Sequence, residues 1–207
     1  MQNDGEKQAA IFLDRDGTIN EEVGYLDRPE KLRMLPGAAR AIRLINECGL
    51  KAIVVTNQSG VARGFFDEAM VAAIHLKMQE FLAAEGARID HFYYCPHHPT
   101  DGAGSYLQEC SCRKPAPGML LRAAEELALS LNDSYIIGDT LKDIEAGGRI
   151  GVKGVLVQTG YGRESAALLA DSDRGTTGAA ICRPVYIAVN LEDAVRWIIA
   201  DRSGERP

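Results

Sequence analysis

The octet Ile-Phe-Leu-Asp-Arg-Asp-Gly-Thr at residues 11–18 constrains this chain more than any other stretch of its sequence. An apolar run that ends in two carboxylates and Gly-Thr predicts a buried strand that delivers Asp14 and Asp16 into a turn. Open α/β sheets place their chemistry at such strand ends. Because alternate side chains of a strand point the same way, we expect Asp14 and Asp16 to converge while Arg15 points elsewhere. Their oxygens suit a hard divalent cation, although an ordinary Asp-Gly turn would show the same pattern.

Apolar, β-rich runs alternate with helix-period segments along the chain, which predicts an α/β fold with a mainly parallel sheet wrapped by helices. The sequence predicts strands at 9–14, 50–56, 91–95, 134–138, 154–158 and 185–189. It predicts helices at 37–48, 67–85, 117–130, 141–150 and 191–200, and a polar loop at 171–184. The length of 207 residues suits one domain with a full core, so we expect residues 1–207 to form a single domain.

Composition and charge limit the classes of partner. The chain is 46% hydrophobic and 25% charged, as is usual for a soluble globular protein. Its formal net charge of -6 provides no general attraction to nucleic acid or to an anionic membrane, so an anionic substrate needs a local cluster of cations. No apolar run approaches the ~20 residues of a membrane span, and residues 1–8 lack the apolar core of a secretory signal. We expect a cytoplasmic monomer that binds neither nucleic acid nor membrane.

Three further motifs fall where predicted strands end, so they would share one edge of the sheet with the octet. The second strand leads into Thr56-Asn57-Gln58-Ser59, whose hydroxyls and amides can donate to phosphate oxygens. Arg113-Lys114 places two adjacent cations before a helix, and Gly138-Asp139 supplies another carboxylate, with Asp143 four residues further on. Each motif alone would also fit a polar turn or a solvated charge pair.

The cysteines indicate a metal site. Three of the five lie between residues 95 and 112, which in a reducing compartment fits metal binding better than disulfide bonds. Three thiolates and one imidazole make a complete tetrahedral set for Zn²⁺ with no open position, which is typical of a structural site. We predict structural Zn²⁺ in a loop over residues 95–112, at Cys95, His97, Cys110 and Cys112. Buried free thiols, or a site that has lost its metal, are the alternative.

Together and in order, Asp-x-Asp-Gly-Thr, Thr-Asn, Lys and Gly-Asp-x-x-x-Asp resemble the motifs of the haloacid dehalogenase superfamily of phosphatases. The resemblance covers nearly the whole chain. It implies a three-layer Rossmann-like fold without a large cap domain. It also implies covalent catalysis, in which Asp14 attacks phosphorus, and Asp16 protonates the leaving alcohol and then activates water.

The resemblance also implies a catalytic Mg²⁺, which offsets the charge of the carboxylate and of the phosphoester. It assigns the ion to Asp14, to the backbone carbonyl of Asp16 and to Asp139. Thr56 and Lys114 would then contact the phosphoryl oxygens. We expect Asp143 to orient Lys114 or a metal-bound water and not to bind the ion directly.

A Zn-binding loop in a capless chain is similar to two groups of this superfamily, the heptose bisphosphate phosphatases and the histidinol phosphatases. The stretches 58–64, 92–99 and 113–119 resemble the first group more closely. This resemblance implies removal of the 7-phosphate from a sugar bisphosphate, D-glycero-D-manno-heptose 1,7-bisphosphate, within lipopolysaccharide biosynthesis. We add Arg63, because a guanidinium suits the retained phosphate. The substrate contacts that the resemblance implies are Glu22, Val23, Gly24, Tyr25, Asn57, Gln58, Ser59 and Arg113.

Two other functions stay open on the sequence alone. A histidinol phosphatase would keep every catalytic residue and change only the substrate, which bears one phosphate and a cationic imidazole and has less use for Arg63. A non-catalytic phosphosugar-binding or regulatory domain could share the fold. The joint presence of Asp14, Asp16, Lys114 and Asp139 argues against it.

Overall fold

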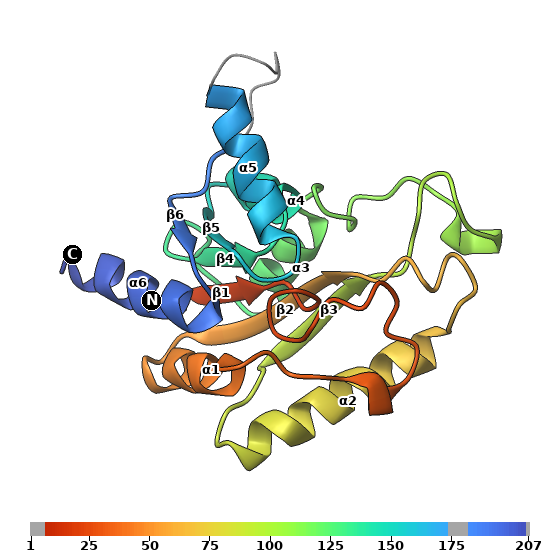
Figure 1. Cartoon of the computed structure of the whole chain (residues 1–207), viewed down its shortest axis with the longest axis horizontal. Coiled ribbons are helices and arrows are strands. Elements are labelled where there is room, and N and C mark those ends of the chain that lie inside the picture. The colour runs from red at the N-terminus through yellow and green to blue at the C-terminus, as the bar shows by residue number, and fades with distance from the viewer. Residues whose placement is uncertain (1–6, 174–181, 206–207) are drawn as a thin grey trace, which may run out of the picture.

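The computed structural model describes residues 7–173 and 182–205, which form a six-stranded sheet with helices on both faces (Figure 1). The strands lie in the order β3-β2-β1-β4-β5-β6, and each adjacent pair is parallel. They are β1 (Ala10–Leu13), β2 (Lys51–Asn57), β3 (His91–Cys95), β4 (Tyr135–Gly138), β5 (Lys153–Val157) and β6 (Tyr186–Ala188). The helices are α1 (Ala38–Glu47), α2 (Glu68–Ala84), α3 (Gly118–Glu126), α4 (Leu141–Gly148), α5 (Gly162–Asp173) and α6 (Leu191–Ser203), with 3-10 helices η1 (Pro29–Lys31) and η2 (Gly104–Tyr106).

The three layers follow from the alternation of side chains along each strand. From β1, Ile11 and Leu13 enter the core beneath α1, α2 and α6, whereas Ala10 and Phe12 enter the core on the opposite face. Helices α3, α4 and α5 cover that second face. The predicted Rossmann-like α/β fold is therefore confirmed, and each of the six predicted strands is present.

Two parts of the prediction were wrong in detail. Helix α5 was not predicted, and its last residues, 171–173, begin the segment expected to be a loop; residues 174–181 of that loop lie outside the described residues. The two large apolar residues of α5, Leu168 and Leu169, are adjacent and only Leu169 is buried, so the sequence shows no repeated apolar spacing. Helix α3 ends at Glu126 and not at residue 130, and Ala128 just beyond it has a positive φ of 50°.

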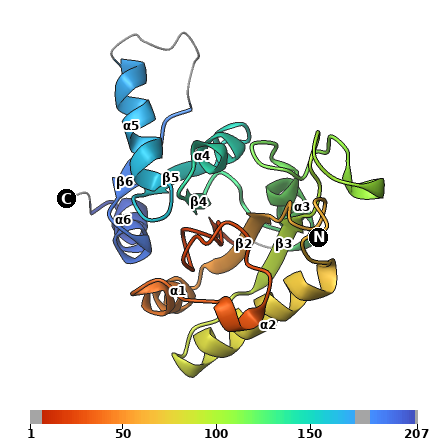
Figure 2. The same cartoon turned by 45° about the vertical axis from the view of Figure 1, so that its right-hand side comes forward.

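The strand order positions the site. The chain runs outward in both directions from β1 and β4, so loops leaving these neighbouring strands diverge and open a crevice at their carboxyl ends. Figures 1 and 2 show the segment between β3 and α3, with η2 in it, projecting beyond the sheet. None of the described helices is long and apolar enough to cross a membrane.

Candidate active site

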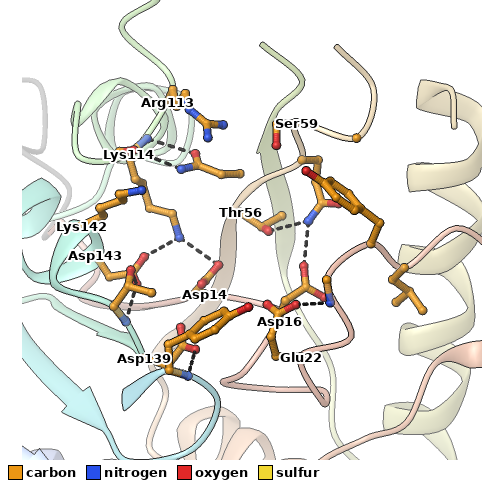
Figure 3. A pocket seen from close by; sticks show the side chains of 18 residues that line it. Asp14, Asp16, Glu22, Thr56, Ser59, Arg113, Lys114, Asp139, Lys142 and Asp143 are labelled. Carbon is orange, nitrogen blue, oxygen red and sulfur yellow. Dashed lines mark hydrogen bonds and ion pairs between the residues drawn. The ribbon is translucent and has the colours of Figure 1, made fainter. Parts of the chain in front are cut away.

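A cavity of about 370 Å³ lies at the carboxyl ends of β1, β2 and β4, and its lining includes Asp14, Asp16, Thr56, Lys114 and Asp139 (Figure 3). The four sequence motifs therefore meet at one edge of the sheet. Asp14 directly follows β1, and its amide donates to the carbonyl of Ile137 at 2.9 Å, which ties the nucleophile candidate to β4.

Lys114 lies between two carboxylates. Its Nζ is 2.8 Å from Oδ1 of Asp14 and 2.5 Å from Oδ1 of Asp143, and it donates to the carbonyl of Val55 at 2.7 Å. The residue is 3% exposed. Burial opposes its charge, but Asp14 and Asp143 outweigh burial and raise the pKa of Lys114. This cation therefore stays charged and partly neutralises the cavity floor.

Asp143 has both oxygens engaged. Oδ2 accepts from the amide of Thr140 at 3.1 Å and from its hydroxyl at 2.6 Å, which caps α4, while Oδ1 faces Lys114. The carboxylate is fully buried. This placement agrees with a residue that orients Lys114.

Asp139 is a buried carboxylate on the lining of the cavity. It is 1% exposed, and the amide of Tyr161 donates to its Oδ2 at 2.8 Å. Burial and the charge of Asp14 raise the pKa of Asp139 to about 8, and burial raises the pKa of Asp14 to about 7 against the opposing effect of Lys114. Gly17 and Gly160 lie so close to Asp139 that a Cβ on either glycine would collide with the Asp139 carboxylate.

The donor set fits Mg²⁺. Asp14, Asp139 and Asp143 each place an oxygen within 4.8 Å of the others. Among the described residues, no backbone amide donates to the carbonyl oxygen of Asp16. Hard oxygen ligands of this kind suit Mg²⁺, and a cation here would offset the burial and the carboxylate repulsion that together raise the pKa values of Asp14 and Asp139.

Asp16 is held by a network that the sequence did not predict. Arg15 does not point away: its Nη2 donates to Oδ2 and Oδ1 of Asp16 at 2.7 and 2.9 Å, and its Nε to Oδ1 at 3.2 Å. Strand β1 ends at Leu13, so the alternation of a strand no longer governs residues 14–16. Asn20 donates to Oδ1 and Gln58 to Oδ2, each at 2.9 Å. Burial alone would raise the pKa of Asp16, but Arg15 with these hydrogen bonds outweighs burial and lowers it.

Most of the predicted substrate contacts line the cavity. They are Glu22, Gly24, Tyr25, Asn57, Gln58, Ser59 and Arg113. The side chain of Asn57 also pairs with the backbone amide and carbonyl of Lys114, both at 3.0 Å, and so fixes the loop that carries the lysine.

Val23 and Arg63 do not line the cavity. Val23 is 47% exposed. Arg63 forms an ion pair with Asp101, and its guanidinium lies over the ring of Tyr25 at 6.0 Å from the centroid. Arg63 therefore contacts a lining residue, Tyr25, and does not itself line the cavity.

The structure also brings Cys95, His97, Cys110 and Cys112 together. The sulfur atoms are 3.2 to 3.5 Å apart, and Nδ1 of His97 is 3.3 Å from the sulfur of Cys112 and 3.7 Å from that of Cys95. A tetrahedron with Zn–S bonds of ~2.3 Å has ligand separations of about 3.7 Å, so these atoms need to move apart only slightly to bind the ion. The donor set fits structural Zn²⁺.

Comparison with known proteins identifies the family. The model of the haloacid dehalogenase-like hydrolases matches residues 2–151, and a related hydrolase model matches residues 111–194. This chain belongs to the haloacid dehalogenase-like hydrolases. The predicted family is therefore confirmed.

Three similar members of this hydrolase family are described as heptose bisphosphate phosphatases. The D-glycero-beta-D-manno-heptose-1,7-bisphosphate 7-phosphatase of Pasteurella multocida is 45% identical over 73% of this chain and 82% of its own length. The D-glycero-D-manno-heptose-1,7-bisphosphate 7-phosphatase of Thermosynechococcus vestitus is 41% identical over 91% of this chain and 94% of its own. A crystal structure of a D,D-heptose 1,7-bisphosphate phosphatase from B. bronchiseptica, complexed with magnesium and phosphate, superposes with a TM-score of 0.79 at 33% identity, covering 94% and 99% of the two chains.

Among the residues that line the cavity of this hydrolase, sequence reasoning missed a cation, Lys142, and an aromatic residue, Tyr161. Lys142 lies in the first turn of α4 on the same side of the cavity as Arg113 (Figure 3). Tyr161 follows the end of β5, so the same strand-end rule that selected Asp139 would have selected it.

Proposed function

We propose that this haloacid dehalogenase-like hydrolase is a phosphatase that removes the 7-phosphate of D-glycero-D-manno-heptose 1,7-bisphosphate. The placement of its cations supports this proposal. Lys114 lies at the nucleophile, whereas Arg113 and Lys142 lie elsewhere on the cavity lining of a chain with a net charge of -6. A substrate with two phosphates uses both groups of cations.

The residues support two-step hydrolysis through an aspartyl-phosphate. Asp14 attacks phosphorus, and Lys114 and the hydroxyl of Thr56 face the phosphoryl oxygens. Asp16 transfers a proton to the leaving alcohol, and in the second step takes one from the attacking water. Asp14, Asp139 and the carbonyl of Asp16 would hold Mg²⁺, which supplies charge neutralisation to the carboxylate and the phosphoester.

Zn²⁺ at the four Cys and His ligands would have a structural role. Cys112 directly precedes Arg113 and Lys114, so an ion there fixes the start of the segment that carries both cations. Because four protein ligands leave no open position, this ion would take no part in the reaction. A single domain over residues 1–207, a monomeric state and a cytoplasmic location stay predictions.

A phosphate-release assay tests the proposal. Both anomers of the heptose 1,7-bisphosphate, a heptose 7-phosphate and histidinol phosphate are compared at matched concentrations. We expect the highest kcat/KM with one bisphosphate anomer. A preference for histidinol phosphate would replace the proposed substrate, and no turnover of any of them would favour a binding domain.

The Arg113→Ala variant tests the physical basis of that preference. Loss of one charge-assisted contact, ~1.5–3 kcal/mol, should lower kcat/KM for the bisphosphate by roughly tenfold or more, and much less for the 7-phosphate. Arg122→Ala removes an exposed arginine outside the cavity and is the control for net charge. Equal losses on the two substrates would mean that Arg113 contacts only the transferred phosphoryl group.

A further inference from the structure

Arg15 is a buried cation that the proposed reaction does not use. It is 1% exposed and makes three hydrogen bonds to the carboxylate of Asp16. Its Nη2 also donates to Oε1 of Gln58 at 3.1 Å, and Gln58 in turn donates to Asp16 and to the hydroxyl of Thr56, the latter at 2.8 Å. The guanidinium therefore lies at the centre of a closed network around one side chain of the site.

His75 supports Arg15 from a different layer of the fold. It lies on α2, is 6% exposed, and places Nε2 3.4 Å from Nη1 of Arg15. Its ring stacks on Phe92 of β3, with centroids 4.5 Å apart and planes at 18°. Burial lowers the pKa of His75 to about 3, and Arg15 acts in the same direction. The neutral ring can therefore accept a hydrogen bond from the guanidinium.

These contacts leave Asp16 restrained but accessible. Each of its oxygens accepts from Arg15 and from one amide side chain, yet 21% of the side chain stays exposed and lines the cavity. Such a carboxylate has little freedom to rotate. Catalytic groups that are held in place by a surrounding shell lose little entropy at the transition state.

We propose that Arg15, supported by His75, is the positioning residue that holds the Asp16 carboxylate as the base for hydrolysis of the aspartyl-phosphate. This inference rests on the two-step reaction proposed above. In that step the water oxygen bonds to phosphorus, the bond from phosphorus to the Asp14 oxygen breaks and returns its electron pair to Asp14, and the water proton passes to Asp16. A displaced Asp16 would slow this step in particular.

The test separates the two half-reactions with 4-nitrophenyl phosphate, whose leaving group departs without help from an acid. Arg15→Met should release the first equivalent of 4-nitrophenol at nearly the wild-type rate and then turn over slowly. We expect the ratio of first-turnover to steady-state rate to rise at least tenfold. The fraction of chains that carry covalent phosphate, measured by intact mass after acid quench with this ester or with the bisphosphate, should rise as well.

Further variants guard against simple loss of folding, because removing one partner of a buried ion pair is strongly destabilising. His75→Phe keeps the stacking on Phe92 and removes the contact with Arg15, so it should shift both readouts in the same direction by a smaller amount. Arg15→Lys keeps the positive charge, so its two readouts should lie between those of Arg15→Met and those of the wild type. Met78→Leu, a conservative change in the buried face of the same helix, should leave both readouts unchanged.

The proposal would be overturned if folded Arg15→Met or His75→Phe lost first-turnover rate and steady-state rate in equal proportion, without accumulation of covalent phosphate. Arg15 would then be a purely structural residue. Unchanged kinetics in both variants would overturn it as well. Failure of the heptose assignment has a different signature, since it would alter the ranking of substrates in the phosphate-release assay and leave the burst with the aryl ester intact.

Discussion

Replacing Asp139 by asparagine is expected to stabilise the Mg²⁺-free protein at neutral pH, although it removes a carboxylate from the site. Asp139 is 1% exposed, and burial with the charge of Asp14 raises its pKa from 3.8 to about 8. Between these values the folded protein retains a proton that the unfolded chain releases. The wild-type protein therefore loses stability as the pH rises through this window.

The size of the effect follows from the width of the window. Each pH unit within this window changes the free energy of unfolding by about 1.4 kcal/mol. Between pH 5 and pH 7, Asp139 therefore lowers the free energy of unfolding of the wild type by roughly 3 kcal/mol. Asparagine has nearly the same shape, and its amide oxygen can still accept from Tyr161, whose amide is 2.8 Å from Oδ2 of Asp139. The free energy of unfolding of the variant, relative to that of the wild type, should therefore rise by about 3 kcal/mol as the pH is raised from 5 to 7.

Urea unfolding at pH 5, 6 and 7 measures this difference. Mg²⁺ is removed by gel filtration and not by a chelator, so that any Zn²⁺ stays bound. Glu125→Gln, at an exposed position of α3, is the control and should differ from the wild type by a constant amount. A difference between Asp139→Asn and wild type that does not change with pH would refute the reasoning.

Adding Mg²⁺ completes the experiment. A ligand that binds only the folded state stabilises it by mass action, so Mg²⁺ should stabilise the wild type and have little effect on Asp139→Asn. Equal stabilisation of both proteins would show that Asp139 is not a ligand.

Two other predictions concern the nucleophile and the second metal. Asp14→Asn, purified free of deamidated protein, should lower kcat by a factor on the order of 10⁴ or more, because the nucleophile is lost; near wild-type turnover would contradict covalent catalysis at Asp14. Protein made without added zinc should contain about one Zn²⁺ per chain by elemental analysis. Cys110→Ala should lose that ion and lower the Tm, and well-folded, active wild-type protein without zinc would show the site to be vestigial.

The sequence by itself determined the fold class and the reacting groups of this hydrolase. Alternating apolar runs are enough to predict six parallel strands, since the spacing of apolar residues is a local property that the sequence displays directly. The strand-end rule is enough to predict that Asp14, Asp139 and Lys114 lie at one edge of the sheet. The cysteine spacing likewise selected four side chains that lie together in the structure.

Only the tertiary structure decided which side chains surround those groups. Arg15 follows β1, His75 lies on α2 and Gln58 follows β2. No spacing in the sequence relates these three residues. Arg63 and Lys142 are both cations near motif residues, yet the first pairs with Asp101 and the second lines the cavity. The direction of a long side chain depends on the partners that packing brings within its reach, and local sequence carries no record of those partners.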